Sequence, residues 1–164
     1  MTDETVPAAT PTTVEQPSRN LGLVKWVGII GIVGGILLIL VGIIAWIAVT
    51  TQLTEENITI PDDAVAMQGQ QVTGPISAYI QADIINTHAL AASDGKTYAE
   101  LDQDDPVRAT VMQASFLRAS LFTSVVAYGV ALFAAAIGVL AILFGWAFIR
   151  LASAPVVVKQ ARVV

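Results

Sequence analysis

The sequence contains no cysteine among its 164 residues and a single histidine, His88. The absence of cysteine excludes disulfide bonds, thiolate zinc sites, iron–sulfur clusters and cysteine nucleophiles. Charged residues are also scarce, at 13% of the chain, whereas ordinary soluble domains have about 25%. Two long runs, Trp26–Val49 and Ala119–Ile149, have no charged residue at all. This composition points away from a soluble domain and from cysteine-based chemistry.

Each uncharged run is long enough to cross a bilayer as one helix, because about 20 apolar residues at ~1.5 Å each match a ~30 Å hydrocarbon core. An uncleaved signal anchor is favoured over a cleaved signal peptide for the first run, since the apolar region of a signal peptide would have about 7–15 residues behind a short basic segment. Here a 25-residue polar leader comes first. We therefore predict an all-α membrane protein, a two-helix transmembrane hairpin with a small helical extracytoplasmic cap between the spans.

The expected organisation has five parts. They are a disordered cytoplasmic tail at 1–22, the first transmembrane helix at 23–50, an acidic extracytoplasmic insert at 51–118, the second transmembrane helix at 119–150 and a basic cytoplasmic tail at 151–164. The first tail is rich in threonine, proline and acids. Such a composition cannot bury enough apolar surface to offset the entropy of ordering.

The distribution of charge predicts the orientation. The insert has ten acidic and three basic residues, a net charge of −7. Lys25 lies directly before the first uncharged run, and Arg150 directly follows the second, with Lys159 and Arg162 close behind. Lys and Arg near a span are retained on the cytoplasmic side, and acids count little. We expect a plasma membrane location with both termini in the cytoplasm and the insert outside.

Small residues follow a four-residue spacing in both runs, which lets two helix backbones approach closely in lipid. This pattern predicts that the two spans pack against each other. A homodimer would use the same faces, and glycine and alanine are also common in membrane helices without such a role. Neither run has an Asp, Glu, His, Lys or Arg residue, which argues against a transporter or pump acting alone. The residues expected at the helix contact are Gly31, Gly35, Ala127, Ala131, Ala135 and Gly138.

The insert is predicted to be helical. Pro75 favours a first helical residue, no breaker follows until Ala92, and Ser93-Asp94-Gly95 ends the pattern. Thr97 and Glu100 have the spacing of a capping box. Asp105 and Pro106 then begin a helix of some 45 residues that has no further proline and includes the second span. We expect the apolar stripe Ile76–Ile84 to pack on the face Val107–Leu117.

No constellation for catalysis emerges from the insert. His88 is alone, so one chain cannot supply the two histidines of a non-haem iron site. Asp102, Asp104 and Asp105 could attract calcium, but the central glycine and distant glutamate of an EF-hand are missing. Helix capping also explains Asp105. We expect no catalytic residue, no metal site and no cofactor.

Several segments of the chain resemble a group of small actinobacterial two-pass membrane proteins. They are Glu56–Ile60, Gly74–Ile85, Gly95–Leu101, Asp105–Thr110 and Ser115–Leu121. The resemblance covers about 56–150 and implies the two-pass topology. Members of this group often carry the label aromatic ring-opening dioxygenase. Extradiol dioxygenases bind iron with two histidines and a glutamate, and this chain has one histidine, so no catalytic residue is carried over.

The favoured hypothesis is a non-enzymatic scaffold or accessory subunit whose cap docks a cell-envelope partner. Its expected partners are the lipid bilayer and a membrane-protein complex or a second copy of the chain, with no nucleic acid. One alternative is an iron-dependent ring-opening dioxygenase in which His88 residues from two chains share one metal. Another is a cap that senses divalent cations through Asp102 and Asp104.

Overall fold

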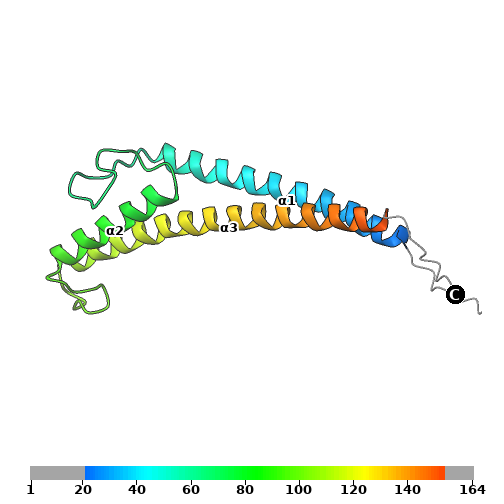
Figure 1. Ribbon diagram of the computed structural model, residues 1–164. Coiled ribbons are helices and arrows are strands. Elements are labelled where there is room, and N and C mark those ends of the chain that lie inside the picture. Colours follow the sequence, from blue (N-terminus) through cyan, green and yellow to red (C-terminus); the bar gives the residue numbers. More distant parts are fainter. Residues whose placement is uncertain (1–20, 154–164) are drawn as a thin grey trace, which may run out of the picture.

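Three helices make up the part of the chain that the structure describes. The computed structural model describes residues 21–153, and the helices in that range are α1 (Leu21–Glu55), α2 (Pro75–Ala92) and α3 (Arg108–Ala152). α1 and α3 run antiparallel, side by side, and form a long narrow hairpin (Figure 1). α2 packs on the first part of α3. The tails expected at 1–22 and 151–164 lie almost wholly outside the described residues.

The length of α3 agrees with the helix of some 45 residues that the sequence predicted. It has 45 residues and is about 67 Å long at the standard rise. It begins at Arg108, two residues after the predicted start, and the Asp105 Oδ1 accepts a hydrogen bond from the Val107 N–H at 2.9 Å. The predicted continuous helix is therefore confirmed. α1, with 35 residues, is about 52 Å long.

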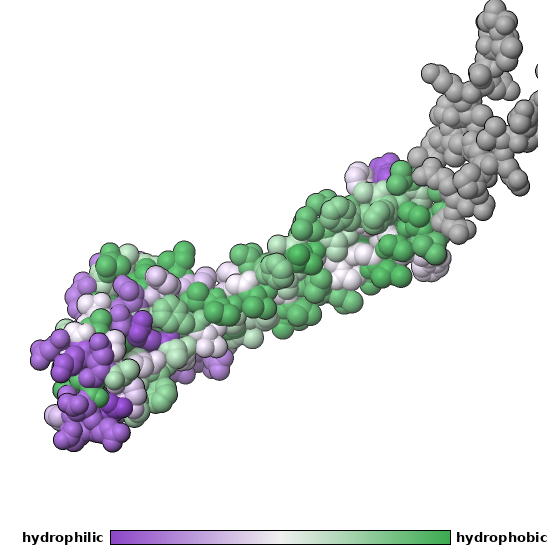
Figure 2. Space-filling model, turned by 90° about the horizontal axis from the view of Figure 1, so that it is seen from below, coloured by the Kyte–Doolittle hydropathy of each residue, from purple (hydrophilic) through white to green (hydrophobic). Residues whose placement is uncertain are grey.

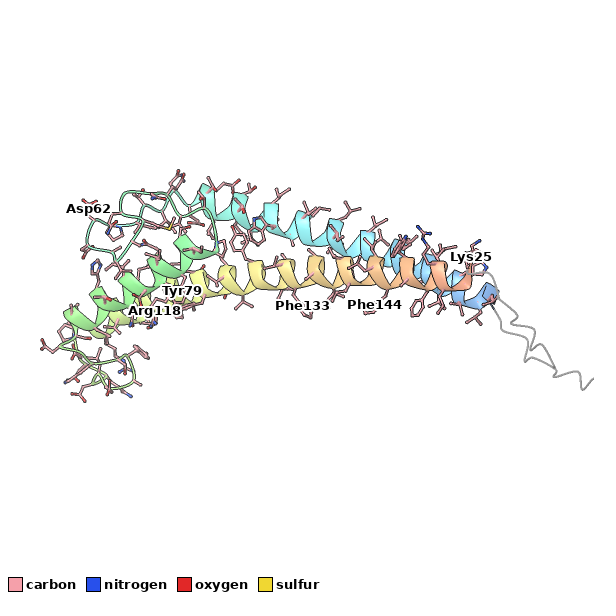
Figure 3. All side chains as sticks on the ribbon, in the orientation of Figure 1. Lys25, Asp62, Tyr79, Arg118, Phe133 and Phe144 are labelled. Atoms are coloured by element: carbon pink, nitrogen blue, oxygen red, sulfur yellow. The ribbon has the colours of Figure 1, made fainter. Side chains whose placement is uncertain are left out.

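The hairpin exposes most of its apolar side chains. Only 17% of the most apolar stretch of either α1 or α3 is buried, whereas a core helix of a soluble protein would be mostly buried. Phe133, 67% exposed, and Phe144 point away from α1 (Figure 3). Figure 2 shows apolar residues along the rod and polar residues gathered at the end that holds the insert. Both helices are long and apolar enough to cross a membrane.

The connection between α1 and α2 is folded, although it contains no strand of its own. Ile60 and Val72 are completely buried. An isolated antiparallel bridge joins Thr59 to Gln71, and the Val72 N–H donates to the Ile58 carbonyl oxygen at 2.9 Å. These contacts turn the connection back on itself, so that its apolar side chains reach the same core as Leu53 of α1.

Helix α2 has the bounds that the sequence predicted. The N–H groups of Thr73 and Gly74 both donate to the Ser77 Oγ at 3.1 Å, which fixes the first turn. At the other end the Gly95 N–H donates to the Leu90 carbonyl oxygen, and Gly95 has a positive φ of 81° that favours glycine. The helix over 75–92 is confirmed.

The buried face of α2 differs from the predicted stripe. Ala78 and Ala82 are completely buried and Ile84 is nearly so, but Ile76 is 69% exposed. The expectation that Ile76 packs on α3 is therefore wrong. Ala78 and Ala82 belong to the same buried core as Tyr128 of α3. Ile76 comes two residues before Ala78, about 200° around the helix at 3.6 residues per turn, and so lies on the opposite face.

Candidate functional site

The two long helices touch backbone to backbone at three levels. A Cβ added to Gly35 would lie 2.5 Å from the Gly138 carbonyl oxygen, and one added to Gly138 would lie 2.5 Å from the Gly35 carbonyl oxygen. The same reciprocal contact joins Gly28 and Gly145. Real Cβ atoms essentially never come that close to a neighbouring atom. Only glycine fits these four positions without a shift of the helices.

The third level has a glycine on one side only. A Cβ added to Gly42 would lie 2.7 Å from the carbonyl oxygen of Ala131, which is itself almost completely buried. The contacts on α1 and on α3 thus repeat every seven residues. A seven-residue repeat keeps one face toward the partner along a left-handed helix pair.

The residues expected at the helix contact occupy different positions in it. Gly35, Ala131 and Gly138 lie at its centre, and the Ala135 Cβ would be 3.4 Å from a Cβ at Gly42. Gly31 lies at the margin, where an added Cβ would meet the Ala141 oxygen at 3.4 Å, an ordinary contact. Ala127 is half-buried.

Three central residues, Gly28, Gly42 and Gly145, are absent from the expected set. The four-residue spacing predicted a contact at Gly31 and Gly35. The seven-residue spacing of the buried glycines in both runs was the signal that could have found them.

Tyr128 joins the hairpin to the insert. Its ring is buried, packs edge-on against Trp46 at a centroid distance of 4.6 Å, and belongs to the same core as Ile60 and Val72. Its hydroxyl shares a hydrogen bond with the Thr50 Oγ1 at 2.8 Å and donates to the Thr73 carbonyl oxygen at 3.4 Å. A single side chain of α3 therefore fixes the end of α1 and the beginning of α2.

A second polar contact holds the α1–α2 connection on α2. The His88 Nε2 lies 2.6 Å from the Asp63 Oδ2, and both side chains are exposed. This hydrogen bond lowers the pKa of the Asp63 carboxyl below its ordinary value, with a smaller contribution from the charge of His88. The only histidine of the chain therefore has a structural partner.

The turn between α2 and α3 is held by local polar contacts. The Thr97 N–H and hydroxyl donate to one Glu100 carboxylate oxygen at 2.8 and 2.7 Å, as the predicted capping box requires on the carboxylate side. Those two bonds, the backbone bond foremost, lower the pKa of Glu100. Arg108 donates to the carbonyl oxygens of Tyr98 and Leu101 and lies 4.2 Å from the Tyr98 ring centroid.

A groove lies where α1, α2 and α3 meet. It has a volume of about 540 Å³. Leu53, Ile85 and Leu121 form part of its apolar wall, while Glu56 and Gln81 add polar groups. The Gln81 side chain is almost completely buried, at 9% exposed, and its Oε1 has no hydrogen-bond partner among residues 21–153. This groove is the best-formed candidate binding site.

The acidic turn shows no metal-binding geometry. Across residues 21–153, no three side chains of His, Asp, Glu or Cys come together in a way that could hold a metal ion. Asp102 and Asp104 are exposed, and Asp105 caps the Val107 N–H. An iron site shared by His88 residues of two chains stays a prediction.

Comparisons of the chain with protein-family models, with curated proteins and with solved structures found no match. Its function must therefore be inferred from its own residues: the glycine contacts, the folded insert and the groove.

Proposed function

We propose that the chain is a two-pass membrane protein whose insert forms a docking cap outside the membrane for an envelope protein with a basic surface. The observation that carries this proposal is the combination of an apolar, mostly exposed hairpin with a compact, strongly acidic insert at one end. In this proposal the hairpin anchors the insert at the outer face of the membrane, and the insert provides the binding surface.

The exposed apolar side chains support the membrane part of the proposal. In water, two helices that leave most of their apolar surface exposed would aggregate, whereas lipid tails provide a suitable solvent for them. In lipid the hydrophobic effect no longer drives helix association, and close backbone packing takes its place. The reciprocal contact of Gly35 with Gly138 is packing of that kind.

The proposed orientation follows from the basic residues near the helix ends. Lys25 and Arg150 lie at the end of the hairpin opposite the insert, and such residues are retained in the cytoplasm. The absence of cysteine makes a direct test simple. Single variants Asp104→Cys, in the insert, and Ser153→Cys, at the other end, are treated in intact cells with a maleimide that cannot cross membranes. We expect labelling of the first only, and labelling of Ser153→Cys alone would reverse the proposed topology.

The insert supports the docking part of the proposal through its shape and charge. Its core is well packed around Ile60, Val72 and Tyr128, so its surface is presented in a defined form. With a net charge of −7, it attracts a partner of opposite charge, and such complementarity accelerates encounter. The proposal assigns the insert a binding role and no reaction.

Site-specific photo-crosslinking tests the docking role. A photoreactive amino acid at Val65, which is 82% exposed on the insert, should capture one envelope protein in native membranes. The same group at Phe133, on the outer face of the hairpin, should capture lipid. Capture from Val65 should weaken when Asp102 and Asp104 are both changed to Asn. A Val65 product that contains only a second copy of this chain, or no protein, would contradict the proposal.

A further inference from the structure

One residue that lines the groove between the three helices has a buried polar atom without a hydrogen-bond partner. Gln81 is about nine-tenths buried, it lines the groove, and its Oε1 lacks a partner within residues 21–153. Burying a side-chain amide oxygen without a hydrogen bond destabilises the folded chain. A ligand with an N–H or O–H donor would remove that destabilisation.

The position of the groove indicates where such a ligand comes from. Gln52 and Glu56 lie just after the uncharged run of α1, while Ser120 and Ser124 lie at the beginning of the uncharged run of α3, and all four line the groove. In a membrane-spanning hairpin this level is that of the outer lipid headgroups. This step rests on the proposed membrane insertion. Lipid is then the most abundant molecule beside the opening.

The chemistry of the walls selects the headgroup. Glu56 is the only charged residue among those that line the groove, so an anionic headgroup would be repelled and a cationic group attracted. The Gln81 oxygen requires a donor, which a primary ammonium has and a quaternary ammonium lacks. The apolar side chains of Leu53, Leu117 and Leu121 line the same groove and suit the beginning of an acyl chain.

We propose that this groove binds one phospholipid whose headgroup carries a primary amine. Its ammonium lies between Glu56 and Gln81, and its acyl chain lies along the three leucines named above. The groove volume of about 540 Å³ falls within the range of roughly 300–1,000 Å³ that small-molecule sites occupy. The bound lipid supplies the missing donor and fills the space between the insert and the bilayer.

The test uses the full chain in nanodiscs that contain equal amounts of phosphatidylethanolamine and phosphatidylcholine with identical acyl chains. Native mass spectrometry then measures the lipids that remain bound after release. We expect one retained lipid per chain, with phosphatidylethanolamine enriched at least several-fold over its bulk ratio. Gln81→Met, which keeps the side-chain volume but removes the amide, should return the ratio to that of the bulk.

Two further variants complete the experiment. Glu56→Gln, at an exposed position, should also abolish the enrichment, and it provides a second test if Gln81→Met fails to fold. Gln103→Met, in the turn between α2 and α3 and outside the groove, should leave the enrichment unchanged. Retention at the bulk ratio, or enrichment that survives both groove substitutions, would overturn the inference.

Carbonate extraction of the same chain from liposomes separates this inference from the proposal on which it rests. A chain that stays in the membrane but shows no preference between the two lipids refutes the lipid site alone. A chain that carbonate releases into solution refutes the membrane hairpin and the lipid site together.

Discussion

Gly35 and Gly138 face each other so closely that a Cβ on either residue would lie 2.5 Å from the carbonyl oxygen of the other. This reciprocity means that neither helix can move away to accept a side chain without breaking the contact on both sides. Because Gly28 with Gly145 repeats the arrangement, the two helices are held along much of their shared length by backbone contact.

The first prediction concerns these glycines. Gly138→Ala should destabilise the hairpin by roughly 1–3 kcal/mol, because the added methyl group overpacks the contact. Gly34→Ala is the matched control, since a Cβ there meets nothing within 4 Å, and it should be neutral or slightly stabilising. Reversible unfolding of the purified protein in mixed micelles measures both changes. Equal stability of the two variants would show that the helices do not pack as described.

The second prediction concerns the hydroxyl of Tyr128. Tyr128→Phe removes its hydrogen bond to the Thr50 Oγ1 and its longer one to the Thr73 carbonyl oxygen, and it should cost about 1 kcal/mol. Thr50→Val should cost a similar amount. Because both substitutions remove the same bond, the double variant should cost clearly less than the sum of the two single changes. Additive losses in the same unfolding experiment would mean that the hydroxyl groups are not coupled.

The sequence predicted the elements whose limits are set by local chemistry. Pro75 and the Ser93-Asp94-Gly95 turn determine the ends of α2, and Asp105 with Pro106 precedes α3. Each of these signals acts within a few residues of the chain, so it can be recognised without the tertiary structure.

Other features depend on which surfaces meet in space. The choice of Gly28 and Gly145 rather than Gly31 follows from a seven-residue contact repeat, and this repeat depends on how the helices cross. The exposure of Ile76 likewise depends on which face of α2 is buried, and that face contains Ala78 and Ala82. The groove at Gln81 is formed by three helices together, so no local pattern in the sequence predicts it.

The third prediction concerns the core of the α1–α2 connection. Ile60→Ala leaves a cavity at a completely buried position and should cost roughly 2–5 kcal/mol. Val65→Ala, on the exposed side of the same connection, should change stability by less than about 0.5 kcal/mol. Hydrogen exchange followed by mass spectrometry should show faster exchange of the Val72 amide in the first variant only. Unchanged protection in Ile60→Ala would indicate that the connection is not anchored by this residue.

The fourth prediction concerns the contact between Asp63 and His88. The hydrogen bond from the imidazole lowers the pKa of the folded Asp63 carboxyl, so ionised Asp63 favours the anchored connection. Since the folded pKa lies below the unfolded value of about 3.9, this contribution is complete above about pH 4 and is lost as the pH falls through the lowered value.

His88→Gln should therefore raise the pKa of Asp63 toward its ordinary value, because the bond that contributes most to the shift is removed. A carbon NMR titration of the Asp63 carboxyl in wild type and variant measures the change. Glu100 provides an internal control, since Thr97 and not His88 lowers its pKa, and its titration should be the same in both proteins. If the Asp63 titration is unaffected by His88→Gln while Glu100 remains shifted, the imidazole does not hold Asp63, and another contact must anchor the connection to α2.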